Sequence, residues 1–337
     1  MKIDVGLVTG LVDSGPRAAE IEAMGFDGTF SFEGPHGPFA PLVLAAEHTT
    51  GLQLSTAIAV AFARNPMTAA QDAQDLQRIS RGRFTLGLGS QIRPHIERRY
   101  SMPWSRPAAR MEEFVRAIRA IWASWSDGVT LDFHGDFYRH DLMTPFFVPG
   151  PNPHGDPPIA LAAVGARMVE VAGRVAEGLI VHPFHTPAFL AAETLPALRR
   201  GLAVHGRDES AVEVTVQTMV AIGDDEDQVA QARGAAKGQL GFYGSTPAYR
   251  GMLDHHGFGD VQPLLRDLTR EGRWADMGSH VPDELVDLVC VSGAPADVGQ
   301  ALRSRNEAAD RTALIVYDRT GRPDALADVV AGFRSAG

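Results

Sequence analysis

The chain has 337 residues, of which 45% are hydrophobic and 21% charged, a composition typical of a globular protein large enough to fold without a metal or disulfide. The formal net charge of −10 argues against nucleic acid as a partner, and the only cysteine, Cys290, excludes an internal disulfide. The first residues lack the pattern of a signal peptide, and no apolar run reaches the roughly 18 residues of a membrane span. We therefore expect a cytoplasmic protein that does not enter a membrane.

Short apolar runs predict β-strands, and these runs alternate with segments of helical periodicity. Helices are predicted at 16–24, at 41–50, from Asn65-Pro66 to residue 79, and at 107–125. In the third of these, Asn is a typical N-cap and Pro is typical of the first turn. Strands are predicted at 3–8, 28–32, 52–60, 84–88, 159–163, 178–182, 212–222 and 312–317.

Eight strands separated by helices indicate βαβ units and a parallel sheet, and eight such units favour a closed (β/α)₈ TIM barrel. A doubly wound sheet is the alternative. Two segments are longer than ordinary connections: 127–157 is rich in Gly, Pro, Asp and His, and 223–311 can hold an extra pair of helices. We expect one barrel domain over residues 1–337, with both insertions shaping its pocket.

A barrel carries its chemistry in the loops that follow the carboxyl ends of its strands. Three of the twelve histidines, His36, His95 and His182, lie at or just beyond such ends. A loop histidine is often only a surface residue, but their shared location favours a common site. The same loops contain Glu33, Gly89, Gln91 and the turn Val164-Gly165-Ala166.

Small residues after the fourth and fifth strands suggest that a ligand approaches the backbone closely there. Gly165-Ala166 leads directly into a helix, whose unpaired N–H groups and positive dipole end suit a phosphate. A tight turn between strand and helix explains the same residues without a ligand.

Metal and Schiff-base chemistry lack their residues in this chain. The first strand carries no His-x-His pair, and Pro183 lies between His182 and His185 without a neighbouring carboxylate, so we expect no metal site. Lys2 at the N-terminus and Lys237 in a predicted helix are the only lysines, and neither suits a Schiff base.

Two further enzyme classes are disfavoured. No Gly-x-Ser-x-Gly elbow occurs, and Cys290 is expected in the core. The pair Gly87-x-Gly89 lacks the third glycine of a dinucleotide-binding fingerprint, because position 92 is Ile92.

The segment from the third helix to the fourth strand resembles the luciferase-like monooxygenase superfamily, and more closely its branch that depends on the deazaflavin coenzyme F420. The resemblance rests on Ala63-Arg64-Asn65-Pro66, Ser80-Arg81-Gly82-Arg83 and Leu86-Gly87-Leu88-Gly89, with weaker support from Pro107-x-x-Arg110-Met111, Ala176-Glu177-Gly178 and Val291-Ser292-Gly293-Ala294-Pro295. These pieces run from near the first strand to the last, so the resemblance covers most of the chain.

The resemblance implies a (β/α)₈ barrel, bound coenzyme F420 or FMN, and a homodimer. It implies that Glu33 and His36 lie near the reactive ring, although the members that show this feature carry an adjacent Asp-His pair. It also implies a non-proline cis peptide at Ala57–Ile58. The cofactor contacts that it implies are Ala57, Ile58, Gly89, Gln91, His95, His182 and the phosphate turn Val164, Gly165 and Ala166.

The chemistry that follows from the resemblance is hydride transfer between F420 and a small organic substrate. His36 is expected to give or take the proton, with Glu33 orienting it or replacing it. His95 is expected to bond the ring, and His182 to face the ring or the substrate. Pocket walls are expected from Phe39, Trp104 and Phe184, for which ordinary packing is an equal alternative.

Two other functions remain open. An FMN-dependent monooxygenase would use oxygen and need a flavin reductase as partner, and a non-catalytic barrel would only bind a flavin. The acidic residue and the histidine after the second strand favour F420.

Overall fold

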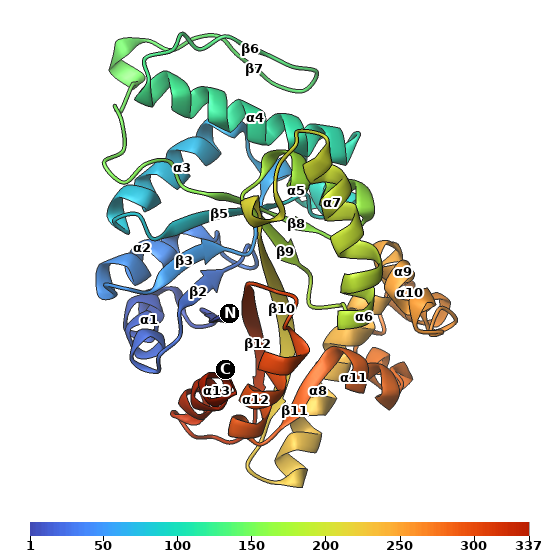
Figure 1. Cartoon of the computed structure of the whole chain (residues 1–337). Helices are drawn as coiled ribbons and strands as arrows, with labels where there is room; N and C mark the ends of the chain where they lie inside the picture. Colours follow the sequence, from blue (N-terminus) through green and yellow to red (C-terminus); the bar gives the residue numbers. More distant parts are fainter. Residues whose placement is uncertain (337) are drawn as a thin grey trace.

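The computed structural model describes residues 1–336, which form a closed barrel of eight parallel strands surrounded by helices (Figure 1). The strands pair in the order β9-β10-β12-β1-β2-β3-β5-β8, and β8 pairs again with β9. Because the ring closes, the doubly wound alternative is wrong and the (β/α)₈ barrel is confirmed. The strands are β1 (Lys2–Gly6), β2 (Gly28–Ser31), β3 (Gln53–Thr56), β5 (Phe84–Gly89), β8 (Ile159–Ala163), β9 (Gly178–Val181), β10 (Glu213–Ile222) and β12 (Arg311–Asp318).

The helices begin and end close to the predicted positions. The cap of the third helix forms as expected, because Asn65 Oδ1 accepts a hydrogen bond from Thr68 N at 3.0 Å. The helices are α1 (Ser14–Ala23), α2 (Phe39–His48), α3 (Pro66–Ile79), α4 (Pro107–Ser126), α5 (Ala166–Val175), α6 (Pro187–Phe189), α7 (Leu195–Ala203), α8 (Glu226–Gly244), α9 (Arg250–His255), α10 (Val261–Glu271), α11 (Asp283–Val289), α12 (Pro295–Arg305) and α13 (Ala325–Ser335).

Strand residues alternate between the helices and the barrel interior, as the pleat requires. Residues such as Leu179 and Val181 pack under the helices in the main hydrophobic core. The intervening residues face inward, and at the amino ends of the strands these are charged. There Arg311 donates hydrogen bonds to Asp4, Glu213 and Gln53, so a polar network fills that end of the barrel.

The insertion 223–311 contains more structure than the expected extra pair of helices. It holds α8 to α12 and a ninth parallel strand, β11 (Cys290–Gly293), which pairs with the second half of β10. This strand was missed because its four residues include only two strongly apolar ones. Helices α8, α9 and α11 pack on the inward side of β10, against Met219 and Ala221, and form a lobe beside the carboxyl end of the barrel (Figure 1).

The insertion 127–157 does not cover the barrel mouth, contrary to our expectation. Its short hairpin, β6 (Phe133–His134) and β7 (Arg139–His140), lies beyond α4, on the side away from the barrel strands (Figure 1). Backbone N–H groups next to the hairpin turn donate to Glu113 on α4. Farther along, Asn152 bonds Gln74 on α3.

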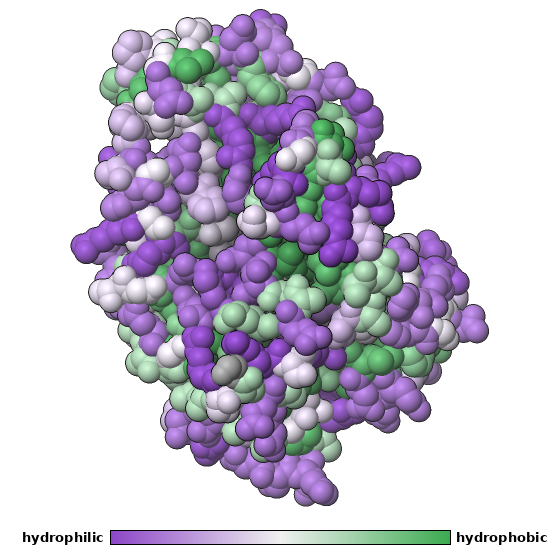
Figure 2. Space-filling model, viewed as in Figure 1, coloured by the Kyte–Doolittle hydropathy of each residue, from purple (hydrophilic) through white to green (hydrophobic). Residues whose placement is uncertain are grey.

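The face of the molecule shown in Figure 2 is predominantly hydrophilic, with apolar residues showing between polar ones. Among residues 1–336, the structure has no helix whose length and apolar character would let it cross a membrane.

Candidate active site

The loops that the sequence singled out come together at the carboxyl end of the barrel, because all the strands are parallel. Strands β5, β8 and β9 are consecutive neighbours in the sheet. The loops with Gln91 and His95, with Gly165, and with His182 are therefore adjacent in space. The loop with Glu33 and His36 follows β2, which is separated from β5 by β3.

A cis peptide joins Ala57 to Ile58, at the position that the resemblance implied. It lies between β3 and the short strand β4 (Ala59–Val60), which continues the pairing with β5. The neighbouring loop holds both residues: Ala57 N donates to Ser31 O at 2.7 Å, and Glu33 N donates to Ile58 O at 3.0 Å.

The segment around the cis peptide leaves no room for a side chain at the glycines of β5. A Cβ atom at Gly87 would lie 1.7 Å from Thr56 O, and one at Gly89 would lie 2.8 Å from Ile58 Cδ1. Neighbouring strands therefore approach each other closely at these glycines, whereas the predicted approach of a ligand stays a prediction. Contact of Gly89 with a cofactor stays a prediction.

Both carboxylate oxygens of Glu33 have protein partners. Oε2 accepts from Val60 N at 2.7 Å and from Arg64 Nη1 at 2.6 Å, and Oε1 accepts from the Tyr100 hydroxyl at 3.1 Å. The side chains of Glu33 and Arg64 are only 9% and 17% exposed. Glu33 therefore anchors the β2 loop to the segment after the cis peptide.

His36 is exposed, and its backbone carbonyl accepts a hydrogen bond from Gly34 N. No hydrogen bond joins its ring to Glu33, whose oxygens are occupied by other donors. An orienting role of Glu33 toward His36 is absent from this structure. The ring of His36 is the free imidazole of this loop.

The loop after β5 carries two features of a ligand contact. Gln91 has a left-handed backbone with φ of 59°, and its side chain accepts from Ile92 N at 3.0 Å. His95 Nδ1 is buried without a hydrogen-bond partner among the described residues. Leaving such an atom unpaired is costly, which favours a bound polar group at this position.

Helix α5 begins at the carboxyl end of β8 with an exposed N-terminus. Gly165 is its N-cap, with φ of −84° and ψ of 147°, and no side chain caps the helix. Gly165 and Ala166 are exposed, and a Cβ at Gly165 would meet no atom within 4 Å. The first N–H groups of α5 are thus accessible to an anion.

His182 follows β9 and has a defined protonation state. Its Nδ1 accepts a hydrogen bond from Phe184 N at 3.1 Å, so the proton of the neutral ring is on Nε2. Burial lowers the pKa of His182 to about 3, and His185 adds to this effect. At working pH the ring is therefore a neutral N–H donor and not an acid.

His185 holds the loop of His182 in place. Its Nδ1 donates to the carbonyl of His182 at 3.0 Å, and burial, with a contribution from Arg305, lowers its pKa to about 4. The described residues contain no cluster of His, Cys, Asp or Glu placed to hold a metal ion. Cys290 is buried as predicted, and burial raises its pKa to about 12.

Of the three aromatic residues proposed for the pocket, only Phe184 lies beside His182. It packs against Tyr243 and Tyr249, whose rings also contact His182. Trp104 packs edge-on against Phe62, and Phe39 lies under the guanidinium of Arg64, both as ordinary packing.

Tyrosines near His182 were missed by the sequence reasoning. Tyr317 is the next-to-last residue of β12, so the rule that strand ends carry the site could have found it. Tyr243 and Tyr249 lie on the 223–311 insertion, and no sequence pattern places them at the mouth.

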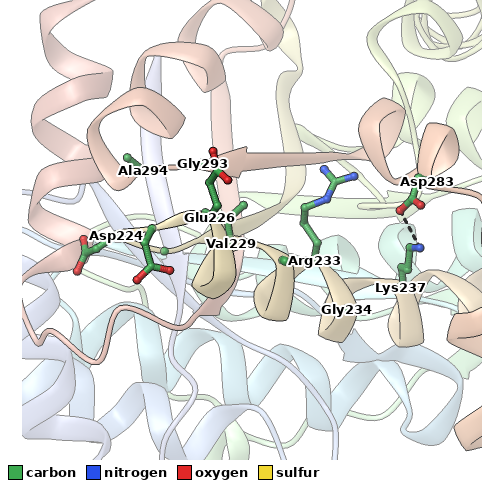
Figure 3. Close-up of a pocket in the computed structure, with 12 residues that line it drawn as sticks. Asp224, Glu226, Val229, Arg233, Gly234, Lys237, Asp283, Gly293 and Ala294 are labelled. Atoms are coloured by element: carbon green, nitrogen blue, oxygen red, sulfur yellow. Dashed lines mark ion pairs between the residues drawn. The ribbon is translucent and has the colours of Figure 1, made fainter.

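A separate cleft of ≈560 Å³ lies between the start of α8 and the turn from β11 to α12 (Figure 3). Its cationic side chains are paired: Arg233 donates to Ser292 Oγ and Asp287, and Lys237 contacts Asp283 at 2.7 Å. The cleft has no contact with the loops after β5 or β8, and we do not assign the active site to it.

The comparisons with known proteins agree with this geometry. A family model described as luciferase-like monooxygenase matches residues 13–312. A Mycobacterium tuberculosis protein of uncharacterised function is 50% identical over 307 residues, which cover 91% of this chain and 90% of the relative. The 5,10-methylenetetrahydromethanopterin reductase of Archaeoglobus fulgidus is 26% identical over 297 residues, with 85% and 84% covered.

Among solved structures, the coenzyme F420-dependent tetrahydromethanopterin reductase from Methanopyrus kandleri superposes with a TM-score of 0.78 at 19% identity, covering 97% of this chain and 96% of that one. This likeness concerns the fold. Since the family model spans nearly the whole barrel, the chain belongs to the luciferase-like monooxygenase family.

Proposed function

We propose that this protein is an oxidoreductase that transfers a hydride between coenzyme F420 and a small organic substrate. One observation carries the proposal. Two sets of polar groups without protein partners lie on the adjacent loops after β5 and β8: His95 Nδ1 and the first N–H groups of α5. A long ligand with a polar ring and a phosphate would satisfy both.

These residues fit a deazaflavin or a flavin. The N-terminus of α5, with Val164, Gly165 and Ala166, would hold the phosphate, and Gln91, His95 and the Ala57–Ile58 segment would contact the ring. When bound, F420 supplies the hydride acceptor or donor. The chain supplies the binding groups and the proton transfer.

The protein groups divide into distinct roles. His36 has the free imidazole of the β2 loop, and we assign it the proton that leaves or joins the substrate oxygen. His182 is held neutral and acts as a hydrogen-bond donor. Glu33 positions the β2 loop through Val60, Arg64 and Tyr100, so it acts through other residues.

A reductase is favoured over a monooxygenase by the 26% identity, over 85% of the chain, with the archaeal 5,10-methylenetetrahydromethanopterin reductase. Coenzyme F420 is the cofactor named for a tetrahydromethanopterin reductase of the same fold. An FMN-dependent monooxygenase, with a flavin reductase as partner, is the second candidate, because the family as a whole is described by that activity. A barrel that binds the cofactor without turnover is the third.

The test is a titration of the purified protein with oxidised F420 and, separately, with FMN, followed by fluorescence quenching. We expect micromolar binding of F420 and much weaker binding of FMN. Tight FMN binding with oxygen consumption would favour the monooxygenase, and binding of neither would refute the proposal. Tight F420 binding without turnover of any substrate would leave the non-catalytic barrel.

A further inference from the structure

The carboxyl ends of β9 and β12 meet a group of aromatic side chains that we call the aromatic wall: His182, Phe184, Tyr243, Tyr249 and Tyr317. His182 is stacked on Tyr249 and lies edge-on to Tyr243, with ring centroids 4.6 Å apart in both pairs. Phe184 lies 5.6 Å from Tyr249, also edge-on. Tyr317 packs against the same hydrophobic cluster as Phe184, Tyr243 and Tyr249, so the wall joins two barrel strands to the insertion 223–311.

The wall faces the barrel mouth. His182 continues the inward-facing series Gly178 and Ile180 on β9, whose alternate residues Leu179 and Val181 pack under the helices. Tyr317 continues the inward-facing series of β12 that begins with Arg311 at the opposite end. Both side chains are partly exposed, so the wall is accessible from the mouth.

Polar atoms of three wall residues, His182, Tyr249 and Tyr317, have no protein partner among the described residues. The hydroxyls of Tyr100 and Tyr138 bond to Glu33 and Arg110, whereas those of Tyr249 and Tyr317 have no hydrogen-bond partner within residues 1–336. His182 Nε2–H is likewise without a partner, since its Nδ1 takes the bond from Phe184 N. The wall thus offers hydrogen-bond donors on an aromatic surface.

The wall contains no positive charge. Burial raises the pKa of Tyr243 to about 12 and the pKa of Tyr249 and Tyr317 above the usual value, and the ionisable neighbours that add to these shifts are Tyr243 and Cys290. A guanidinium next to a phenol lowers the pKa of the phenol, as Arg110 does for Tyr138, and within the described part of the chain no such contribution is found for the three wall tyrosines. The phenols therefore stay protonated and neutral.

The cations on the helices that cover the wall are paired with carboxylates. Arg250 bonds Asp254 at 3.2 Å, Lys237 bonds Asp283 at 2.7 Å, and Arg233 bonds Asp287 at 2.7 Å. Beside Tyr317, the Asp318 carboxylate accepts from Thr320 N and Oγ1. Arg305, near His185, donates to the carbonyls of Leu288 and Val289.

We infer that the aromatic wall binds the substrate and selects an uncharged alcohol or carbonyl compound with an apolar body over phosphorylated or carboxylated substrates. The donors on His182, Tyr249 and Tyr317 match the oxygen of such a compound, and the rings match its carbon skeleton. An anionic substrate would lose its hydration against the uncharged rings of this wall. This inference rests on the proposed function, because it places the substrate opposite the loops assigned to the cofactor.

The test compares acetophenone with 4-acetylbenzoate, which has the same skeleton and one negative charge. Binding of each to the F420-loaded protein, and to the protein alone, is measured by saturation-transfer NMR and calorimetry. We expect acetophenone to bind at least 10-fold more tightly. In Y317F and Y249F the affinity for acetophenone should fall several-fold, whereas Y138F, outside the wall, should leave it unchanged. Equal or tighter binding of the carboxylate, or unchanged affinity in both wall variants, would overturn the inference.

A charge substitution gives a second readout. Y317R places a guanidinium on the wall and should reverse the preference in favour of 4-acetylbenzoate. If this variant does not fold, Y317F and Y249F still test whether the wall binds the substrate. Failure of the proposed function is seen separately, because it would abolish F420 quenching while the preference between the two ketones is measured on the protein alone.

Discussion

The N-terminus of α5 allows a substitution that should raise stability while lowering cofactor affinity. Gly165 is an uncapped N-cap in extended conformation, and a side chain there would meet no atom within 4 Å. In G165D the new carboxylate can accept a hydrogen bond from the first turn of α5 and interact favourably with the helix dipole. The free energy of unfolding should therefore rise by about 0.5 kcal/mol.

The same carboxylate would lie close to a phosphate bound at this helix end. For two charges roughly 5 Å apart at the protein surface, we expect a penalty of about 2 kcal/mol after screening, which is about a 30-fold higher Kd. The assay is F420 quenching for affinity and thermal unfolding for stability. A more stable protein that binds F420 more weakly would separate the ligand effect from damage to the fold.

The matched control is G165N, because asparagine has the same size and caps a helix equally well without a charge. Its affinity for F420 should stay within about threefold of that of the unmodified protein, since a threefold change is less than 1 kcal/mol. If G165D and G165N bind F420 alike, the start of α5 does not hold an anionic group and our account of the site is wrong.

Three further predictions follow from the ionisable groups. E33Q keeps the shape of the side chain but removes the charge beside Arg64, so the free energy of unfolding in urea should fall by about 2 kcal/mol. A loss below about 0.5 kcal/mol would show that the ion pair of Glu33 and Arg64 does not anchor the β2 loop. Burial raises the pKa of Asp4 from 3.8 to about 6, so the stabilisation that its proton provides is present below pH 3.8 and lost as the pH rises through 6. The loss should be roughly 3 kcal/mol in denaturant unfolding, and D4N should not show it. Parallel stability curves of D4N and the unmodified protein between pH 4 and 7 would contradict this. H36N should lower turnover far more than H182Q does, because we assign proton transfer to His36, whereas His182, whose pKa is lowered to about 3, acts only as a hydrogen-bond donor; the reverse result would exchange the roles of the two histidines.

The barrel and the positions of its loops could be predicted from the sequence because they depend on local patterns. Inward and outward residues alternate within each strand, and a helix start such as Asn65-Pro66 is determined by neighbouring residues. Since the strands are parallel, their carboxyl ends must share one face, which is why His95, Gly165 and His182 were placed together correctly.

Roles that depend on distant contacts were decided only by the tertiary structure. The sequence suggests that Glu33 is a catalytic acid next to His36. In the structure, its carboxylate oxygens accept hydrogen bonds from Val60, Arg64 and Tyr100, the last of these 67 residues away. Likewise, the sequence does not show that Ile58, 31 residues away, leaves no room for a side chain at Gly89.

The state of His182 depends on the insertion 223–311, which carries Tyr243 and Tyr249 onto its ring. Burial by these residues changes an ordinary histidine into a neutral donor, and no pattern within β9 encodes that change. Local alternation determines where a side chain points, whereas its charge and partners depend on which distant segment packs against it.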